Sequence, residues 1–304
     1  MLFQIRHVTR FKYEQPAYES HNELRMRPLE GPRQRCISFG LEIDPVGAIM
    51  EYQDFYGNSV HALSVYPPHG ALVIAAQSLV ERLPEVGDVA GAMTFREFLA
   101  RDLSRNRLEY DFLNPSTYVP FSDPLRKFFW MVHPANDEDV FEYVQRVVGF
   151  VRGQFEYEPG LTQVHSTADE ILTIGGGVCQ DFAHLAIGVL RLAGVPARYV
   201  SGYLAPTSKS APPTRAAPSA SHAWLEAQVP LLGWVGFDPR HGCRTDFRHI
   251  RVAIGRDYAD VPPIRGVFRT AGGGQKMTVE LDIEPADSAQ TGPPRYPGQS
   301  QSQQ

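Results

Sequence analysis

The sequence contains little cysteine, and its cysteines form no pattern. Only Cys36, Cys179 and Cys243 occur in 304 residues, and no CxxC pair is present. An odd number of widely spaced cysteines provides neither a disulfide framework nor a zinc knuckle. Any functional cysteine is therefore expected to be a free thiol, and we predict no metal site and no cofactor.

A basic surplus and a long apolar run are also missing. The net charge is −5 and the pI is near 6.1, which disfavours a nucleic-acid-binding surface. No uncharged apolar run approaches the ~20 residues that cross a bilayer. The first thirteen residues alternate in polarity and do not form a signal-peptide block. We predict a cytoplasmic protein that binds neither nucleic acid nor membranes.

The composition is that of a globular protein, with 43% apolar and 21% charged residues. Residues 3–13 alternate as a strand does, and similar alternation follows at 39–43, before a turn signal at 44–47, and at 61–65, after a turn signal at 56–58. Residues 1–83 are therefore predicted to form an antiparallel β domain.

Helical periodicity begins after residue 93. Helices are expected at 94–103, from a cap at Asn136-Asp137 to Gly153, and from the glycines at 175–177 to Gly194. Strands are expected at 198–204, 222–229, 234–238, 249–254 and 277–283. Residues 84–285 would thus form an α+β core. Residues 204–220 are predicted to be a mobile loop and residues 286–304 a disordered tail.

Cys179 occupies a position suited to a nucleophile. It lies in the first turn of the third predicted helix, where backbone N–H groups lack intrahelical partners. The helix N-terminus carries roughly +0.5 charge, which favours a thiolate. The glycines at 175–177 let another backbone or a substrate carbonyl approach closely. Taken alone, such a cysteine is more simply a small buried hydrophobe.

His222 and Asp238 complete a candidate triad. His222 starts a strand whose alternate residues are apolar, so it points to the opposite face, and Asp238 ends the next strand. Together the three supply the nucleophile, general base and orienting carboxylate that acyl transfer by a thiol requires. A four-residue turn at 230–233 would put Asp238 across the sheet from His222. The hypothesis therefore requires an odd-length loop or a bulge.

Four motifs in this order carry a family resemblance: GVCQDFA at 177–183, GVPARYVSGY at 194–203, SHAW at 221–224 and GWVGFDP at 233–239. They resemble the core of the transglutaminase-like superfamily, its bacterial branch in particular. The resemblance implies a nucleophilic Cys179, a basic His222 and an orienting Asp238. It also implies a papain-like α+β fold, with the cysteine-bearing helix packed on an antiparallel sheet. The N-terminal part and residues 251–263 resemble the same branch.

The sequence departs from the animal members of that family. They carry a tryptophan after the nucleophile, where this chain has Gln180, and they use an upstream tryptophan as an oxyanion donor, for which Tyr157 is a nearby substitute here. Tyr157 and Gln180 are therefore candidate oxyanion or substrate-binding residues. Trp224 and Trp234 are candidate walls of the substrate cleft. No acidic loop of the D-x-[DN]-x-[DN]-G kind argues for calcium.

We therefore predict acyl transfer on peptide or carboxamide bonds through a thioester, with a peptide or protein as substrate. Water as acceptor makes the protein a cysteine peptidase or amidase, which we favour, whereas an amine acceptor makes it a transglutaminase that forms isopeptide bonds. The triad is the same in both. A non-catalytic peptide-binding protein that keeps the fold is a third hypothesis. The loop at 204–220, just before His222, is predicted to act as a lid.

Overall fold

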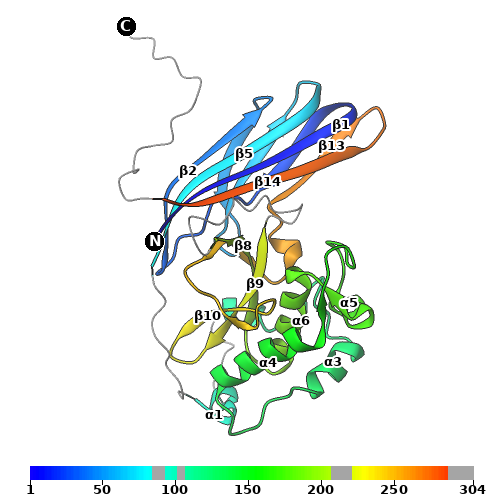
Figure 1. Ribbon diagram of the computed structural model, residues 1–304. Helices are drawn as coiled ribbons and strands as arrows, with labels where there is room; N and C mark the ends of the chain where they lie inside the picture. The colour runs from blue at the N-terminus through cyan, green and yellow to red at the C-terminus, as the bar shows by residue number, and fades with distance from the viewer. Residues whose placement is uncertain (84–92, 101–106, 207–220, 287–304) are drawn as a thin grey trace.

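The computed structural model describes residues 1–83, 93–100, 107–206 and 221–286, which form two stacked units (Figure 1). The first unit is a seven-stranded sheet in the order β2-β5-β1-β4-β3, with β13 and β14 also paired to β1. Its strands are β1 (Leu2–Leu24), β2 (Gln34–Asp44), β3 (Ala48–Gln53), β4 (Ser59–Val65), β5 (His69–Arg82), β13 (Ile264–Thr270) and β14 (Gln275–Ala286). All of these pairings are antiparallel, as the alternating sequence predicts.

Strand β1 is longer than its sequence pattern indicates. The predicted strand ends at Tyr13, whereas β1 continues to Leu24 through an irregularity at Glu19, which has a φ of +62°. Its first half pairs with β5 and β14, and its second half with β4 and β13. The alternation fails around the irregularity because an extra residue shifts the register there.

The last two strands join the first unit. The predicted core, residues 84–285, includes residues 264–285, but β13 and β14 pair with β1 of the first unit. Residues 271–274 connect these two strands. A strand pattern specifies alternation but not the partner strand, so the sequence could not show that the chain returns to its N-terminal sheet.

The second unit is a five-stranded antiparallel sheet, in the order β11-β10-β9-β8-β12, covered by helices. Its strands are β8 (Ala197–Leu204), β9 (His222–Val229), β10 (Gly233–Asp238), β11 (Cys243–Arg244) and β12 (His249–Gly255), with a separate parallel pair, β6 (Glu156–Tyr157) and β7 (Gly176–Gly177). Its helices are α1 (Phe95–Leu99), α2 (Arg107–Asp111), α3 (Asp123–Trp130), α4 (Val140–Gln154), α5 (Ala168–Ile174), α6 (Cys179–Leu192) and the short η2 (Tyr258–Asp260).

Helix α6 packs on β9 with α4 beside it (Figure 1). The predicted α+β fold, with the cysteine-bearing helix on an antiparallel sheet, is therefore confirmed. The N-cap of α4 is Asp139 and not Asn136-Asp137, because the Asp139 side chain accepts the N–H groups of Phe141 and Glu142 at 2.8 and 3.2 Å. Helix α1 spans Phe95–Leu99, and residues 101–103 of the predicted helix lie outside the described residues.

An apolar interface joins the two units. Phe3, Ile5 and Val80 of the first unit pack with Tyr203 and Ile250 of the second, and all are buried. Beside them, the Tyr203 hydroxyl lies 2.8 Å from Nδ1 of His7.

Two predictions from the sequence lie largely outside the described residues. They are the mobile loop at 204–220, of which only residues 204–206 are described, and the tail at 286–304, whose first residue belongs to β14. No helix within the described ranges is long and apolar enough to cross a membrane.

Candidate active site

The β9–β10 hairpin places His222 and Asp238 on one face of the sheet. Val229 pairs with Gly233, so the connecting loop has three residues, 230–232. Phe237 pairs with Leu225, which sets Asp238 opposite Trp224 and on the face of His222. Positive φ values of 64° at Leu231 and 74° at Gly233 accommodate this tight turn. The odd-length loop required by the sequence analysis is confirmed.

The three candidate triad residues form a continuous chain of contacts. His222 Nε2 lies 2.7 Å from Asp238 Oδ2. The His222 imidazole also hydrogen-bonds the Cys179 side chain. Because Nε2 contacts Asp238, Nδ1 is the ring nitrogen left for this bond. Cys179 is 9% exposed, His222 5% and Asp238 0%. The chain of contacts therefore runs from a fully buried carboxylate to a cysteine that is itself largely buried.

Asp238 contacts three imidazoles. Besides His222, His241 Nδ1 lies 2.6 Å and His249 Nε2 3.1 Å from the same oxygen, Oδ2. The second oxygen, Oδ1, accepts the backbone N–H groups of Arg240 and His241 at 3.0 and 3.3 Å. Burial by itself raises the pKa of Asp238, but the hydrogen bonds from the three histidines outweigh it and hold the pKa far below its ordinary value. The carboxylate therefore stays ionised in the protein interior.

The environment of His222 favours an imidazolium. Burial lowers its pKa, but the hydrogen bonds to Asp238 and Cys179 and the negative charges of both raise the pKa to about 9. At neutral pH the ring therefore carries its second proton and faces the sulfur. A protonated imidazole beside the nucleophile can act as the general acid that protonates the leaving group.

His241 and His249 are site residues that the sequence analysis missed. His241 lies in the turn that follows Asp238, and His249 begins β12, which was predicted only as a strand. The His249 side chain is 3% exposed, contacts Asp246 Oδ1 at 3.1 Å and packs edge-on against Trp224. The available signal was the presence of two further histidines within eleven residues after Asp238.

The glycines before Cys179 serve the chain's own packing. A Cβ on Gly176 would lie 2.8 Å from the backbone oxygen of Glu156, and one on Gly177 2.3 Å from the Asp181 carboxylate. The expected close backbone approach is therefore present, but at these two positions the space is filled by Glu156 and Asp181, and no substrate carbonyl fits.

Asp181 fixes the turn that presents the cysteine. Its Oδ2 accepts the N–H of Val178 at 2.8 Å and the hydroxyl of Thr162 at 2.5 Å. Burial raises the pKa of Asp181, and these two hydrogen bonds partly offset the effect. Because Val178 immediately precedes the first helical residue, the contact holds Cys179 at the start of α6.

The two candidate oxyanion residues differ in placement. Tyr157 pairs with Gly177 across β6 and β7, close to the nucleophile, and the Arg240 guanidinium lies over its ring at 4.0 Å. Burial and the nearby Cys179 charge raise the pKa of Tyr157, so its hydroxyl keeps its proton. The Gln180 side chain is occupied elsewhere, because its Nε2 donates to the Val164 carbonyl at 3.0 Å.

Trp224 lies behind the site, whereas Trp234 packs away from it on the same face of the sheet. Trp224 is 1% exposed and packs near the rings of His222 and His249. Trp234 is covered by the Arg198 guanidinium, 4.1 Å from the ring centroid. Both tryptophans line a cavity of about 510 Å³ on the side of the sheet opposite α6, which does not include Cys179.

One group of described residues has metal-ligand geometry. Ligand atoms of His222, Asp238 and His241 all lie within 4.8 Å of one another. Hydrogen bonds of 2.7 and 2.6 Å already join both histidines to the carboxylate. A charged carboxylate and two imidazoles suit a borderline metal such as zinc, but the hydrogen bonds account for the cluster without one.

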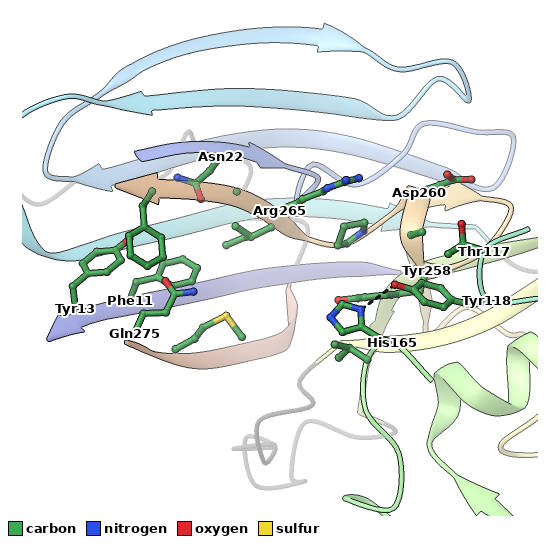
Figure 2. Close-up of a pocket in the computed structure, with 17 residues that line it drawn as sticks. Phe11, Tyr13, Asn22, Thr117, Tyr118, His165, Tyr258, Asp260, Arg265 and Gln275 are labelled. Atoms are coloured by element: carbon green, nitrogen blue, oxygen red, sulfur yellow. Dashed lines mark hydrogen bonds between the residues drawn. The ribbon is translucent and has the colours of Figure 1, made fainter. Parts of the chain in front are cut away.

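A larger cavity of about 680 Å³ lies between the two units (Figure 2). In Figure 2, Phe11, Tyr13 and Gln275 lie at one end of it and Tyr118 and His165 at the other, where a 3.0 Å hydrogen bond joins the last two. None of the described lining residues belongs to the triad.

Comparison with known proteins identifies two matching regions. Residues 3–81 match the family model for the bacterial transglutaminase-like N-terminal region, and residues 131–239 match the model for the transglutaminase-like superfamily. The second match contains Cys179, His222 and Asp238.

Whole-chain relatives exist in mycobacteria. The chain is 33% identical to Uncharacterized protein ML0607 of Mycobacterium leprae, over 92% of this chain and 96% of that protein. It is 30% identical to Uncharacterized protein Rv2569c of Mycobacterium tuberculosis, over 93% of this chain and 92% of that protein. A solved structure of a candidate cysteine protease from Cytophaga hutchinsonii shares the fold, with a TM-score of 0.72 at 22% identity over 94% of this chain and 92% of the other.

Proposed function

The chain belongs to the transglutaminase-like superfamily, and on that basis we propose that it is a cysteine peptidase or amidase. The observation that carries the proposal is the contact chain from Asp238 through His222 to Cys179. Each member has the state its role needs: an ionised buried carboxylate, a protonated imidazole, and a sulfur at the positive end of α6.

The reaction follows from these positions. The Cys179 thiolate attacks the carbonyl carbon of an amide, and the His222 imidazolium gives its proton to the nitrogen as the C–N bond breaks. The amine or ammonia leaves, and the acyl group remains on sulfur as a thioester. Water then attacks the thioester while His222 takes a proton from it, which releases the carboxylic acid and restores the thiolate. Asp238 keeps the imidazole oriented throughout.

The start of α6 contributes to stabilising the oxyanion. Cys179 is the first helical residue, so its N–H has no partner within the helix. A donor of this kind, aimed at the developing oxyanion, is worth on the order of 3 kcal/mol in the transition state. The Tyr157 hydroxyl, which keeps its proton beside Cys179, is our candidate for the second donor.

We favour water over an amine as the acceptor, and the test uses both. The full chain is incubated with glutamine-containing peptides and a fluorescent primary amine, and peptide cleavage, ammonia release and amine incorporation are followed together. The proposal predicts cleavage or ammonia release that Cys179→Ala abolishes and that Cys243→Ala, at an exposed free cysteine, leaves intact.

Two outcomes overturn the proposal. Incorporation of the amine in preference to hydrolysis would assign a transglutaminase. Peptide binding of equal strength in the native chain and in Cys179→Ala, without turnover of any peptide in a broad mixture, would assign a binding protein that retains the fold.

Our proposal places this reaction in the cytoplasm. The support is that Cys36, Cys179 and Cys243 are all free and that Cys243 is exposed, a state that a reducing compartment maintains. Fractionation of cells expressing the native protein tests this, because recovery in an extracytoplasmic fraction would contradict it.

A further inference from the structure

The loop that follows Asp238 carries an arginine at the edge of the candidate active site. The backbone N–H of Arg240 donates to Asp238 Oδ1 at 3.0 Å, which fixes the start of this loop beside the triad. The Arg240 side chain is half-buried, and its guanidinium carbon lies 4.0 Å from the centroid of the Tyr157 ring. Arg240 is thus tied to the triad through its backbone and holds its charge over the neighbouring tyrosine.

Tyr157 places this charge close to the nucleophile. It pairs with Gly177, two residues before Cys179, and the charges of both Cys179 and Arg240 act on the Tyr157 hydroxyl. A peptide whose amide reaches Cys179 therefore also lies near the Arg240 guanidinium. Consecutive residues of an extended peptide are about 3.5 Å apart, so a group one or two residues from the reacting amide comes within reach of Arg240.

The nearest carboxylates of the chain are bound to other groups. Asp238 and Asp181 are the two carboxylates whose charge acts on the Tyr157 hydroxyl. Asp238 accepts hydrogen bonds from three imidazoles and two backbone N–H groups. Asp181 accepts a backbone N–H and a hydroxyl. Neither forms an ion pair with the Arg240 guanidinium, and no other carboxylate among the described residues does.

A second arginine lies against the same loop. A Cβ on Gly242 would be 3.4 Å from Cγ of Arg152, an exposed residue near the end of α4. The exposed Glu156 and Glu158 flank Tyr157 in the chain, but alternation along the strand turns them away from the face that the Tyr157 ring occupies. In the part of the chain that the structure describes, no ion pair joins either arginine to a carboxylate.

The contact with Tyr157 leaves the Arg240 guanidinium able to bind an anion. Packing on an aromatic ring uses one face of the guanidinium, whereas its N–H donors point outward in its plane. Those donors match the two oxygens of a carboxylate. Because the ring already restrains the side chain, a carboxylate binds it with less loss of side-chain freedom than it would a fully mobile arginine.

We propose that Arg240 is a specificity residue that binds a carboxylate of the substrate, one or two residues from the amide that Cys179 attacks. This inference rests on the proposed function and names its substrate class, peptides with an acidic group beside the reacting amide. The carboxylate belongs either to an aspartate or glutamate side chain or to the C-terminus of the substrate.

Matched peptides test the effect of the charge. The set consists of acetylated, glutamine-containing pentapeptides with glutamate or methionine at each other position in turn, each made with a free and with an amidated C-terminus. We expect kcat/KM to be about tenfold higher or more for the favoured acidic peptide than for its neutral counterpart, because a charge-assisted hydrogen bond is gained. Whether the glutamate pairs or the C-terminal pairs show the preference identifies the source of the carboxylate.

Variants of Arg240 separate specificity from support of Tyr157. Arg240→Gln should make acidic and neutral peptides equally good substrates, chiefly by raising KM for the acidic ones, and Arg240→Lys should retain part of the preference. If Arg240 only held Tyr157 in place, Arg240→Gln would lower kcat equally for both kinds of peptide and leave the preference unchanged. That result would overturn the inference.

Arg126→Gln is the matched control. The Arg126 guanidinium lies over the Phe121 ring, 5.8 Å from its centroid, on helix α3, which carries no candidate site residue. It is thus an arginine in the same kind of contact, and its loss should leave the preference for acidic peptides intact. An equal loss of preference in Arg126→Gln and Arg240→Gln would contradict the assignment.

Titration of the same peptides into Cys179→Ala makes the test independent of turnover. If the native chain hydrolyses acidic and neutral peptides equally well, the inference is overturned and the proposed function stands. If no peptide is turned over, the proposed function fails. Tighter binding of acidic peptides to Cys179→Ala, lost when Arg240→Gln is added, would then still support the carboxylate site. Equal affinity for both kinds of peptide, or no binding of the acidic ones at millimolar concentration, would overturn it.

Discussion

The two faces of strand β9 differ in chemistry although they share a backbone. One face, Ala223, Leu225, Ala227 and Val229, packs under α6 in the main core. The other carries His222 of the candidate active site, and Trp224 and Glu226, which line the cavity of about 510 Å³. Because side chains alternate along a strand, one eight-residue segment anchors the nucleophile's helix and also supplies its base.

Two buried histidines, His184 of α6 and His222 of β9, have pKa values shifted in opposite directions. His184 of α6 is stacked near Tyr118 and Tyr199, and burial lowers its pKa to about 4. His222 is similarly buried, yet its anionic neighbours raise its pKa to about 9. Burial alone therefore does not distinguish a structural histidine from a functional one; the charges that it contacts do.

The largest expected effect is a loss of catalytic rate on removal of the Asp238 carboxylate, which contacts His222 of the polar face. Asp238→Asn should lower kcat by about 10³- to 10⁴-fold, because the amide no longer holds His222 in the reactive tautomer. The matched control is Asp246→Asn, which removes a carboxylate that contacts His249 but not His222. Steady-state rates that fall equally in both variants would show that general charge loss, and not orientation of His222, is responsible.

The apolar face should respond in stability and not in chemistry. Leu225 is fully buried under α6, so Leu225→Ala should lower the free energy of unfolding by about 3 kcal/mol. At temperatures where this variant remains folded, its kcat should stay within a few-fold of the native value. Gln228→Ala, on the other face of the same strand, should cost less than about 1 kcal/mol. Urea unfolding of both variants gives the comparison.

His222 and His184 should change the stability of the folded state with pH in opposite directions. The raised pKa of His222 contributes stability that is fully present below pH 6.5 and disappears as the pH rises through about 9. The lowered pKa of His184 makes the folded state lose stability as the pH falls from 6.5 to about 4.

Unfolding free energies of the native chain, His222→Gln and His184→Gln, measured from pH 4 to 9.5, separate these effects. The advantage of the native chain over His222→Gln should shrink on the alkaline side, by on the order of 3 kcal/mol. The acid-side loss should be reduced in His184→Gln. The same slope in all three proteins above pH 6.5 would contradict the account of His222.

The smallest effects are expected at the two other histidines that contact Asp238, His249 and His241. His249→Gln should lower kcat by about tenfold with little change in KM, because Asp238 loses one of the hydrogen bonds that fix it while His222 keeps its own. His241→Gln removes another contact to the same oxygen from a more exposed position and should have a smaller effect. A shift of the alkaline limb of the kcat profile in His249→Gln would distinguish a positioning role from general destabilisation.

The sequence predicts what depends on local periodicity. The alternation in β9 placed His222, and the apolar periodicity of α6 placed Cys179 at its first turn. The odd-length β9–β10 loop that brings Asp238 to His222 was a requirement of the hypothesis, and the structure supplies it. The pairing of β13 and β14 with β1 was not predictable, because it depends on contacts between residues at least 240 positions apart in the chain. The roles of His241 and His249 were missed for a similar reason, because their contacts with Asp238 depend on the folded positions of the chain and leave no local pattern in the sequence.

Alkylation of Cys179 by iodoacetamide tests the central claim most directly. Peptide mapping follows all three thiols in one sample, and burial raises the pKa of Cys36 to about 11 and also that of Cys243, so both serve as internal controls. Taking the ratio of rates at pH 6 and pH 9 removes differences in access. An ordinary thiol slows roughly two-hundredfold between pH 9 and pH 6. The account predicts that Cys179 slows less than about fivefold and that His222→Gln restores the ordinary dependence. A native Cys179 that already follows the ordinary dependence would contradict it.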